Sequence, residues 1–170
     1  MPNIPVSPRF TARQLSFTII DDILNPSNSI PPLYMQVNPS TFSMSYQKKI
    51  NRYQTFDAYI EEYWGEELDT VSCNGSTGGF ILEDLGLNTK YRTQTKPYFK
   101  FQDLVDIYRN NGDTYDDSGR VVKKGNVLLS FDIGSYYGYF ENFNYSESGD
   151  VPFRFVFDFA FKVERSYIGF

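Results

Sequence analysis

The chain of 170 residues is long enough for one domain with its own core, and 41% of its residues are hydrophobic. Its net charge of −5 argues against a broad affinity for nucleic acid, because a phosphate-binding surface needs concentrated positive charge. The chain has no histidine and a single cysteine, Cys73. These counts exclude Ser-His-Asp and Cys-His catalysis, an intrachain disulfide and most catalytic zinc sites.

The aromatic content indicates the fold class. The sequence holds 16 Phe and 14 Tyr against 3 Met, and aromatic side chains fit the half-buried surface of a sheet better than they fit a helix. We therefore predict a mainly β fold with one helix. Residues 14–170 are expected to form a single domain, and residues 1–13, which contain three prolines, an extended arm.

The first predicted strands follow an alternation of apolar and polar residues. Leu15, Phe17 and Ile19 alternate with Ser16 and Thr18, which predicts a strand. A turn is expected at 25–29, a short strand at 33–37, and a half-buried strand at 41–47 that carries Phe42, Met44 and Tyr46 on one face.

Residues 55–65 fit two structures. Phe56, Tyr59, Ile60, Tyr63 and Trp64 recur at helical spacing, yet the segment is rich in aromatic residues and ends at Gly65. We favour a strand and keep a helix as the alternative. A further strand is predicted at 68–73, and the glycine-rich residues 74–79 are expected to form a turn or an adaptable contact loop.

One helix is predicted at about 98–111. Phe101, Leu104, Val105 and Tyr108 stand at positions i, i+3, i+4 and i+7, which gives a single apolar stripe. Pro97 is tolerated just before the first turn, and Gly112 is suited to the left-handed conformation that ends many helices.

The remaining residues predict β structure. A hairpin tip is expected at 116–120, followed by strands at 127–133 and 136–145. The last strand has the clearest pattern, because apolar residues occupy every second position over 153–163. A period of two over eleven residues predicts a strand about twice the usual length.

The densest acidic segment holds Glu61, Glu62, Glu66, Glu67 and Asp69. A glycosidase needs two carboxyl groups facing one another about 5–9.5 Å apart across a sugar. No spacing here singles out such a pair, so we favour a solvated acidic face or a set of partners for basic residues on a neighbouring subunit.

Other motifs give no convincing chemical site. Asp113, Asp116 and Asp117 lack the spacing of a calcium-binding loop, and residues 74–79 lack the Gly-Lys-Ser/Thr ending of a phosphate-binding loop. Cys73 is expected to be a small buried residue. We therefore predict no catalytic residue, no metal, no cofactor and no enzymatic activity.

Several short motifs follow one another in a recognisable order. An apolar strand, Asn38-Pro39 and an alternating strand over 33–46 come first, then Glu62-Tyr63-Trp64-Gly65-Glu66-Glu67-Leu68, and then the Gly-Ser-Thr-Gly segment within 71–80. The helix and the long final strand come after them. This order, over roughly residues 33–165, resembles bacteriophage tail proteins of the tail-tube-like, baseplate-hub and distal-tail kind.

The resemblance implies a β-sandwich or barrel with a flanking helix and a structural role in the virion. It implies a ring of copies around the tail channel, with a hexamer favoured and a trimer possible, that joins tube to baseplate and touches neighbouring tail tube and baseplate proteins. DNA would be only passing cargo, and the protein would be made in the host cytoplasm. The candidate subunit contacts are the acidic segment, the glycine-rich loop and a tyrosine-rich run, namely Glu61, Glu62, Trp64, Glu66, Glu67, Ser76, Thr77, Tyr136, Tyr137 and Tyr139.

A carbohydrate-binding β-sandwich is the alternative, with Trp64, Tyr136 and Tyr137 as exposed stacking residues. The sequence offers no basic stretch followed by an apolar one at its start and no apolar run of about 18 residues. Neither a signal peptide nor membrane insertion is therefore expected.

Overall fold

A computed structural model describes residues 14–20, 31–80, 91–111, 113–123 and 125–168. The expected N-terminal arm at 1–13, the turn at 25–29 and Gly112 lie outside these residues. The described elements, in chain order, are β1 (Ser16–Ile20), β2 (Leu33–Tyr34), β3 (Thr41–Ser45), β4 (Lys48–Gln54), β5 (Tyr59–Glu66), β6 (Asp69–Ser76), a 3-10 turn (Arg92–Gln94), α1 (Lys96–Asn110), β7 (Thr114–Tyr115), β8 (Val121–Lys123), β9 (Asn126–Phe131), β10 (Gly134–Ser148) and β11 (Val151–Ile168).

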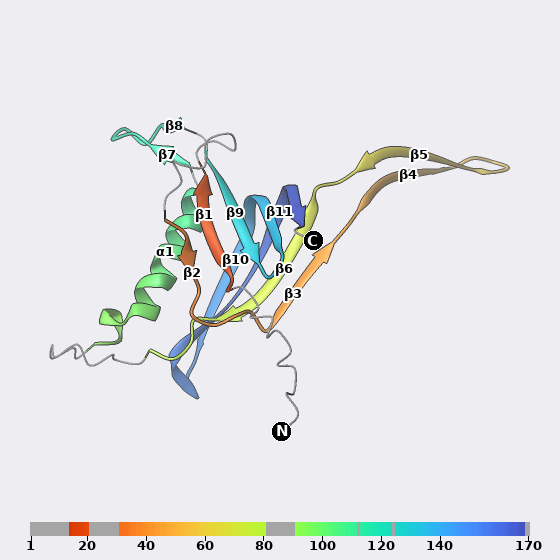
Figure 1. The fold of residues 1–170 in the computed structure, drawn as a ribbon. Coiled ribbons are helices and arrows are strands. Elements are labelled where there is room, and N and C mark those ends of the chain that lie inside the picture. The colour runs from red at the N-terminus through yellow and green to blue at the C-terminus, as the bar shows by residue number, and fades with distance from the viewer. Residues whose placement is uncertain (1–13, 21–30, 81–90, 112, 124, 169–170) are drawn as a thin grey trace, which may run out of the picture.

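Seven strands form one antiparallel sheet in the order β2-β1-β9-β10-β11-β6-β3 (Figure 1). The sheet curls strongly. Phe42 on the edge strand β3 lies 4.8 Å from Phe131 and 5.7 Å from Tyr136, measured between ring centroids, although β9 and β10 stand several strands away in the sheet order. The predicted mainly β class with one helix is confirmed, and the strands form one curled sheet with the shape of an open barrel.

The core lies on the inner face of this sheet. Phe155, Phe157, Phe159, Phe161 and Val163 all point inward from β11 and are buried, which confirms the period-two prediction for the final strand. The pattern fails at its first member. Phe153 is 63% exposed, because Pro152, Phe153 and Arg154 fall in a register shift between the pairs Glu147–Phe155 and Ser148–Val151.

Helix α1 packs against the same inner face. Phe101 lies 4.7 Å from Phe155, and Tyr108 lies 6.0 Å from Phe140, between ring centroids. The helix ends at Asn111, whose left-handed φ of 45° supplies the stop that we had expected from Gly112. The Asn111 side chain donates to the Phe140 carbonyl (3.0 Å) and accepts from the Phe140 N–H (2.7 Å), so it joins the end of the helix to β10.

The glycine-rich segment is not a loop throughout. Asn74, Gly75 and Ser76 belong to β6, where they pair with Asp158, Phe157 and Val156 of β11. Gly75 is required there for space, because an added Cβ would lie 2.9 Å from the ring of Phe157. The prediction of a turn or contact loop at 74–79 is therefore wrong for its first three residues.

Other predicted elements differ less from the structure. The strand expected at 33–37 ends at Tyr34, and the buried Met35 that follows donates its N–H to the Leu15 carbonyl at 2.9 Å. The hairpin tip at 116–120 is confirmed. Asp116 accepts hydrogen bonds from the Ser118 hydroxyl and from the backbone N–H groups of Ser118 and Arg120, which together lower its pKa, with the Ser118 hydroxyl contributing most.

Candidate assembly surface

One part of the molecule projects away from its body, by which we mean the seven-stranded sheet and helix α1. β4, the turn 55–58 and β5 form a two-stranded ribbon, Lys48–Glu66, which we call the projecting hairpin (Figure 1). It continues the β3–β6 ladder of the main sheet, and the Glu67 N–H still donates to the Gln47 carbonyl at 2.9 Å where the two parts meet. The strand predicted for 55–65 is confirmed for Tyr59–Glu66, and the helical alternative is wrong.

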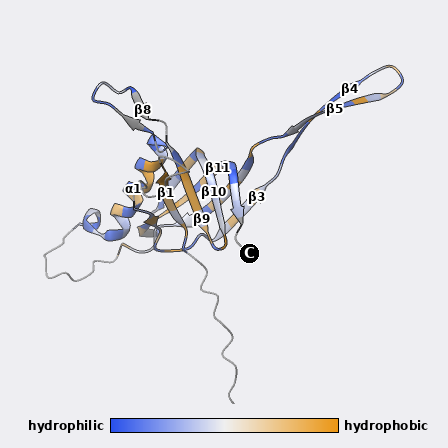
Figure 2. Cartoon of the chain, turned by 45° about the horizontal axis from the view of Figure 1, so that its top comes forward, coloured by the Kyte–Doolittle hydropathy of each residue, from blue (hydrophilic) through white to orange (hydrophobic). Residues whose placement is uncertain are grey.

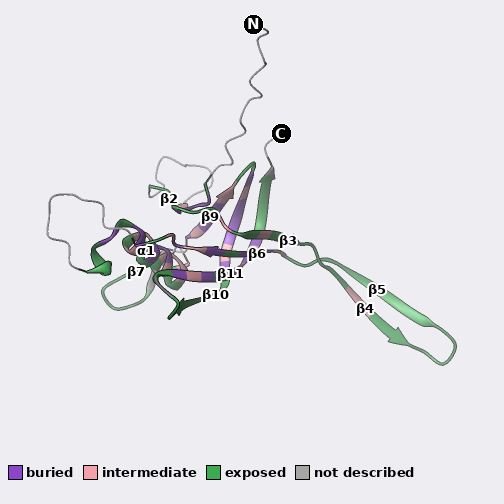
Figure 3. Ribbon diagram, turned by 90° about the horizontal axis from the view of Figure 1, so that it is seen from below, coloured by how far each residue is buried: buried purple, intermediate pink, exposed green. Residues whose placement is uncertain are grey.

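The projecting hairpin has almost no buried surface. Every residue of β5 is exposed, as Figure 3 shows by colour. Figure 2 shows that strongly hydrophobic residues concentrate in the body. The hairpin nevertheless carries many large apolar or aromatic side chains that are at least half exposed, namely Tyr53, Phe56, Tyr59, Ile60, Tyr63 and Trp64. An isolated two-stranded hairpin is marginally stable in water, so this arrangement calls for a partner surface.

Both faces of the ribbon carry apolar groups. The register pairs Tyr53 with Ile60 on one face, and Ile50 with Tyr63 on the other. Side chains that are directly paired across strands share a face, and neighbours along a strand alternate. The hairpin therefore lacks the division into one apolar face and one polar face that strands packed against a core usually have.

Polar contacts fix the ribbon locally. The Arg52 guanidinium lies 2.9 Å from a carboxylate oxygen of Glu61 on the opposite strand, and the Tyr63 hydroxyl donates to Glu61 at 3.0 Å. The hydrogen bond to Glu61, followed by the negative charge of that carboxylate, raises the pKa of Tyr63. At the turn, the Thr55 hydroxyl donates to the Ala58 carbonyl at 2.7 Å.

The acidic segment does not form a paired-carboxylate site. Glu61 and Glu62 are adjacent in β5 and so project to opposite faces of the ribbon. Glu61 is held by Arg52 and Tyr63, and Glu66 lies at the base of the hairpin opposite Lys48. Among the described residues, no group of three or more His, Cys, Asp or Glu side chains is placed to hold a metal ion.

The ten predicted contact residues separate into two groups. Glu61, Glu62, Trp64 and Glu66 lie on β5 and Glu67 directly follows it, and all five are exposed. Ser76 and Tyr139 are half-buried in β6 and β10.

Thr77, Tyr136 and Tyr137 are buried within the protomer, and this corrects their expected place on the surface. The Thr77 hydroxyl oxygen accepts from the Phe155 N–H at 3.1 Å, so the side chain serves the sheet. Burial, first of all, raises the pKa of Tyr136. The Tyr137 hydroxyl is hydrogen-bonded to the Asn126 side chain.

The predicted contact residues did not include five exposed residues of the hairpin, namely Tyr53, Phe56, Tyr59, Ile60 and Tyr63. A signal was present, because apolar residues occupy both odd and even positions of this strand among charged residues. A strand that buries one face against its own core alternates strictly. Cys73 is buried as expected, and burial raises its pKa to about 12.

Comparisons with known proteins give fold likenesses at low similarity. No family model matches the chain, and no curated protein sequence matches it. One similar structure is a chain from the sheath/tube terminator, in its extended state, of an extracellular contractile injection system, PVC. It has 10% identity and a TM-score of 0.40 over 100% of this chain and 99% of that chain.

Two further chains come from gene transfer agent particles. One is from the native virion, with 9% identity and a TM-score of 0.40 over 91% of this chain and 95% of that chain. The other is from the tail of the empty particle, refined with C6 symmetry. It has 9% identity and a TM-score of 0.41, and the match covers 91% of this chain and 96% of that chain. At this level of similarity the likenesses assign neither a family nor a function.

Proposed function

We propose that this protein is a structural subunit of a phage-tail-like particle, and that the projecting hairpin is its main contact with neighbouring subunits. The observation that carries the proposal is the hairpin itself, a ribbon with apolar side chains exposed on both faces and no packing from its own body. The resemblance of the chain order to tail proteins supplies the kind of assembly.

The size of the hairpin indicates how it is used. Its strands have 7 and 8 residues, so each face offers about half of them, whereas a stable interface takes about 20–30 residues from each partner. One face alone is too small. We infer that both faces are covered in the assembled particle, as they would be between two neighbours of a ring or of a stack.

The proposed assembly is a ring of copies around a channel, located between tail tube and baseplate. We favour a hexamer over a trimer. DNA would pass through such a channel without a specific site, which is consistent with the net charge of −5. No helix in the described part of the chain is long and apolar enough to span a membrane.

The alternative, a carbohydrate-binding module, loses support from the structure. Of its three proposed stacking residues, Tyr136 and Tyr137 are buried and only Trp64 is exposed. Trp64 lies on β5 of the projecting hairpin, away from Tyr136 and Tyr137 of β10.

The test uses particles purified from cells that encode this protein. The wild-type chain is expected in the particles by mass spectrometry. A variant with residues 49–65 replaced by a two-residue turn is expected to fold, because the body contributes the core, and to be missing from the particles. As a control, Asp117→Ser at the β7–β8 tip is expected to be incorporated normally. Absence of the wild-type protein, or full incorporation of the shortened variant, would overturn the proposal.

A further inference from the structure

A second exposed aromatic surface lies at the opposite end of the molecule from the projecting hairpin. Tyr91, Phe99, Tyr145 and Phe153 are all more than half exposed, and we call them the aromatic end. They come from the start of α1 and from the turn-proximal part of β10 and β11, which lie on the far side of the body from the hairpin in both Figure 1 and Figure 3.

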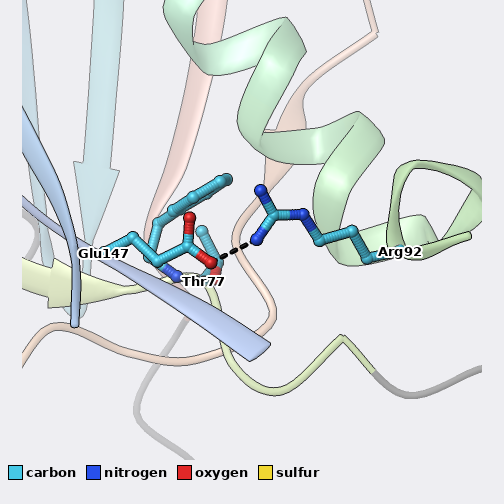
Figure 4. Close-up of polar contacts among 4 residues, drawn as sticks. Thr77, Arg92 and Glu147 are labelled. Carbon is cyan, nitrogen blue, oxygen red and sulfur yellow. Dashed lines mark hydrogen bonds and ion pairs between the residues drawn. The ribbon is translucent and has the colours of Figure 1, made fainter. Parts of the chain in front are cut away.

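Two contacts join the elements that carry the aromatic end. Arg92 pairs with Glu147 of β10, and its guanidinium lies 5.8 Å from the centroid of the Phe155 ring (Figure 4). Phe101 lies 5.1 Å from Tyr145, between ring centroids. The start of the helix and the β10–β11 hairpin are thus fixed to each other.

The exposure of Phe153 is a product of local backbone structure. Phe153 stands at an odd-numbered position of the final strand, like the buried Phe155 and Phe157. The register shift between β10 and β11 beside it nevertheless leaves its ring exposed to solvent. Bulges commonly re-aim a side chain in this way. A phenylalanine held out of the core at a chain reversal is one sign that this end meets another protein.

The two ends carry opposite charge. Residues 48–67 hold five carboxylates against three cations, whereas residues 91–100 and 145–154 of the aromatic end together hold four cations against two carboxylates. Cations in the first turn of a helix oppose the helix dipole, and α1 starts at Lys96 with no acidic residue in its first turn. The positive charge of this segment is therefore not a product of the helix dipole, and it complements the acidic hairpin.

We propose that the projecting hairpin of one copy docks on the aromatic end of a second copy, head to tail. Two different, complementary patches at opposite ends of a subunit generate heterologous contacts, which build rings or stacks instead of closed dimers. This inference rests on the proposed function and adds its acceptor surface. Aromatic side chains would fill the contact, and the charge difference would orient it.

The test cross-links two variants of the full chain, each with one introduced cysteine. Cys73 does not interfere at neutral pH, because it is 3% exposed and burial raises its pKa to about 12. Asp57→Cys marks the hairpin turn and Thr93→Cys marks the aromatic end, and both positions are exposed. Asp117→Cys, exposed at the β7–β8 tip, is the control acceptor. Each variant is first checked for an unchanged melting temperature.

A concentrated mixture of the Asp57 and Thr93 variants, treated with a short bis-maleimide, is expected to give several-fold more cross-linked dimer than the mixture with the Asp117 variant. The yield is expected to fall at high salt. Equal yields, no product, or dimers formed by the Asp57 variant alone would overturn the docking. Sedimentation of the wild-type and hairpin-shortened chains separates the two claims. If the wild type associates through its hairpin without an Asp57–Thr93 product, only the acceptor surface is wrong. If shortening the hairpin leaves association unchanged, the proposed function fails as well.

Discussion

Two long hairpins in this protein have opposite relations to water. β10 and β11 have 15 and 18 residues, and their inward residues form an aromatic core in which Phe157 stacks on Phe159 at 6.4 Å between centroids. The projecting hairpin also carries aromatic residues, yet none of its strand residues is buried. Aromatic content alone therefore does not decide burial. What differs is the face to which the aromatic residues belong, because β11 keeps Phe155, Phe157, Phe159 and Phe161 on one face and the projecting hairpin has aromatic residues on both.

This difference suggests different roles for the two hairpins, one in the folding of the protomer and the other in the proposed assembly of protomers. The β10–β11 hairpin is stabilised within the protomer, where each fully buried Phe contributes about 1.5–3 kcal/mol. The projecting hairpin has no such contribution from the described part of its own chain, and under the proposed function it would gain one from partners. Substitutions in the first should change stability, and substitutions in the second should change assembly.

The largest effect is expected from Phe157→Asp. Phe157 is 1% exposed, and an unpaired carboxylate there should cost several kcal/mol of unfolding free energy. Trp64→Asp in the projecting hairpin is the matched variant and should shift that free energy by less than about 0.5 kcal/mol. Chemical denaturation of both measures the difference. Similar losses in the two variants would show that the hairpin contributes to the folding of the protomer.

A backbone contact in β10 gives the next prediction. A Cβ at Gly138 would lie 1.8 Å from the Lys162 carbonyl oxygen of β11, whereas a Cβ at Gly149 in the turn meets open space. Gly138→Ala should therefore lose roughly 3 kcal/mol of stability, and Gly149→Ala should be nearly neutral. Thermal melts of the pair test this, and a neutral Gly138→Ala would mean that the two strands do not approach so closely.

Thr77→Val should have a smaller effect. Its hydroxyl oxygen accepts from the Phe155 N–H in a buried site, and leaving that donor unpaired should cost about 1–3 kcal/mol. Thr77→Ser retains the acceptor and should lose less. If Thr77 instead belonged to a subunit contact, both variants would fold like the wild type and assemble poorly.

Cys73 gives an effect that is absent at neutral pH and appears only at high pH. Its folded pKa of about 12 is raised from an ordinary value of 9.0 by burial. The unfolded thiol ionises first as the pH rises, so the contribution of the neutral thiol is complete below pH 9 and is lost between about pH 9 and 12. Cys73→Ala should remove this part of the pH dependence, which urea titrations of both proteins would detect.

Sequence patterns predicted the parts of this fold that depend on local periodicity. The spacing of Phe101, Leu104 and Tyr108 placed the helix at 98–111, and the structure has it at Lys96–Asn110. Patterns failed where a distant contact decides the outcome. Gly75 was expected in a loop, but it lies in a strand because the Phe157 ring packs over it.

The candidate surface was predicted only in part, for a similar reason. The acidic residues of 61–67 were placed correctly on the surface, whereas Tyr136 and Tyr137 were expected there and are buried. Tyrosine is common both in cores and in interfaces, so residue type did not separate the two. Their burial depends on the curl of the sheet and on the Asn126 side chain, neither of which local sequence encodes.

Hydrogen exchange of the projecting hairpin, compared between dilute monomer and assembled particle, tests the central claim most directly. Backbone amides of Lys48–Glu66 should exchange quickly in the monomer and become strongly protected on assembly, while those of β10 and β11 should be protected in both. A hairpin that stays as exposed in the particle as in the monomer would contradict the account.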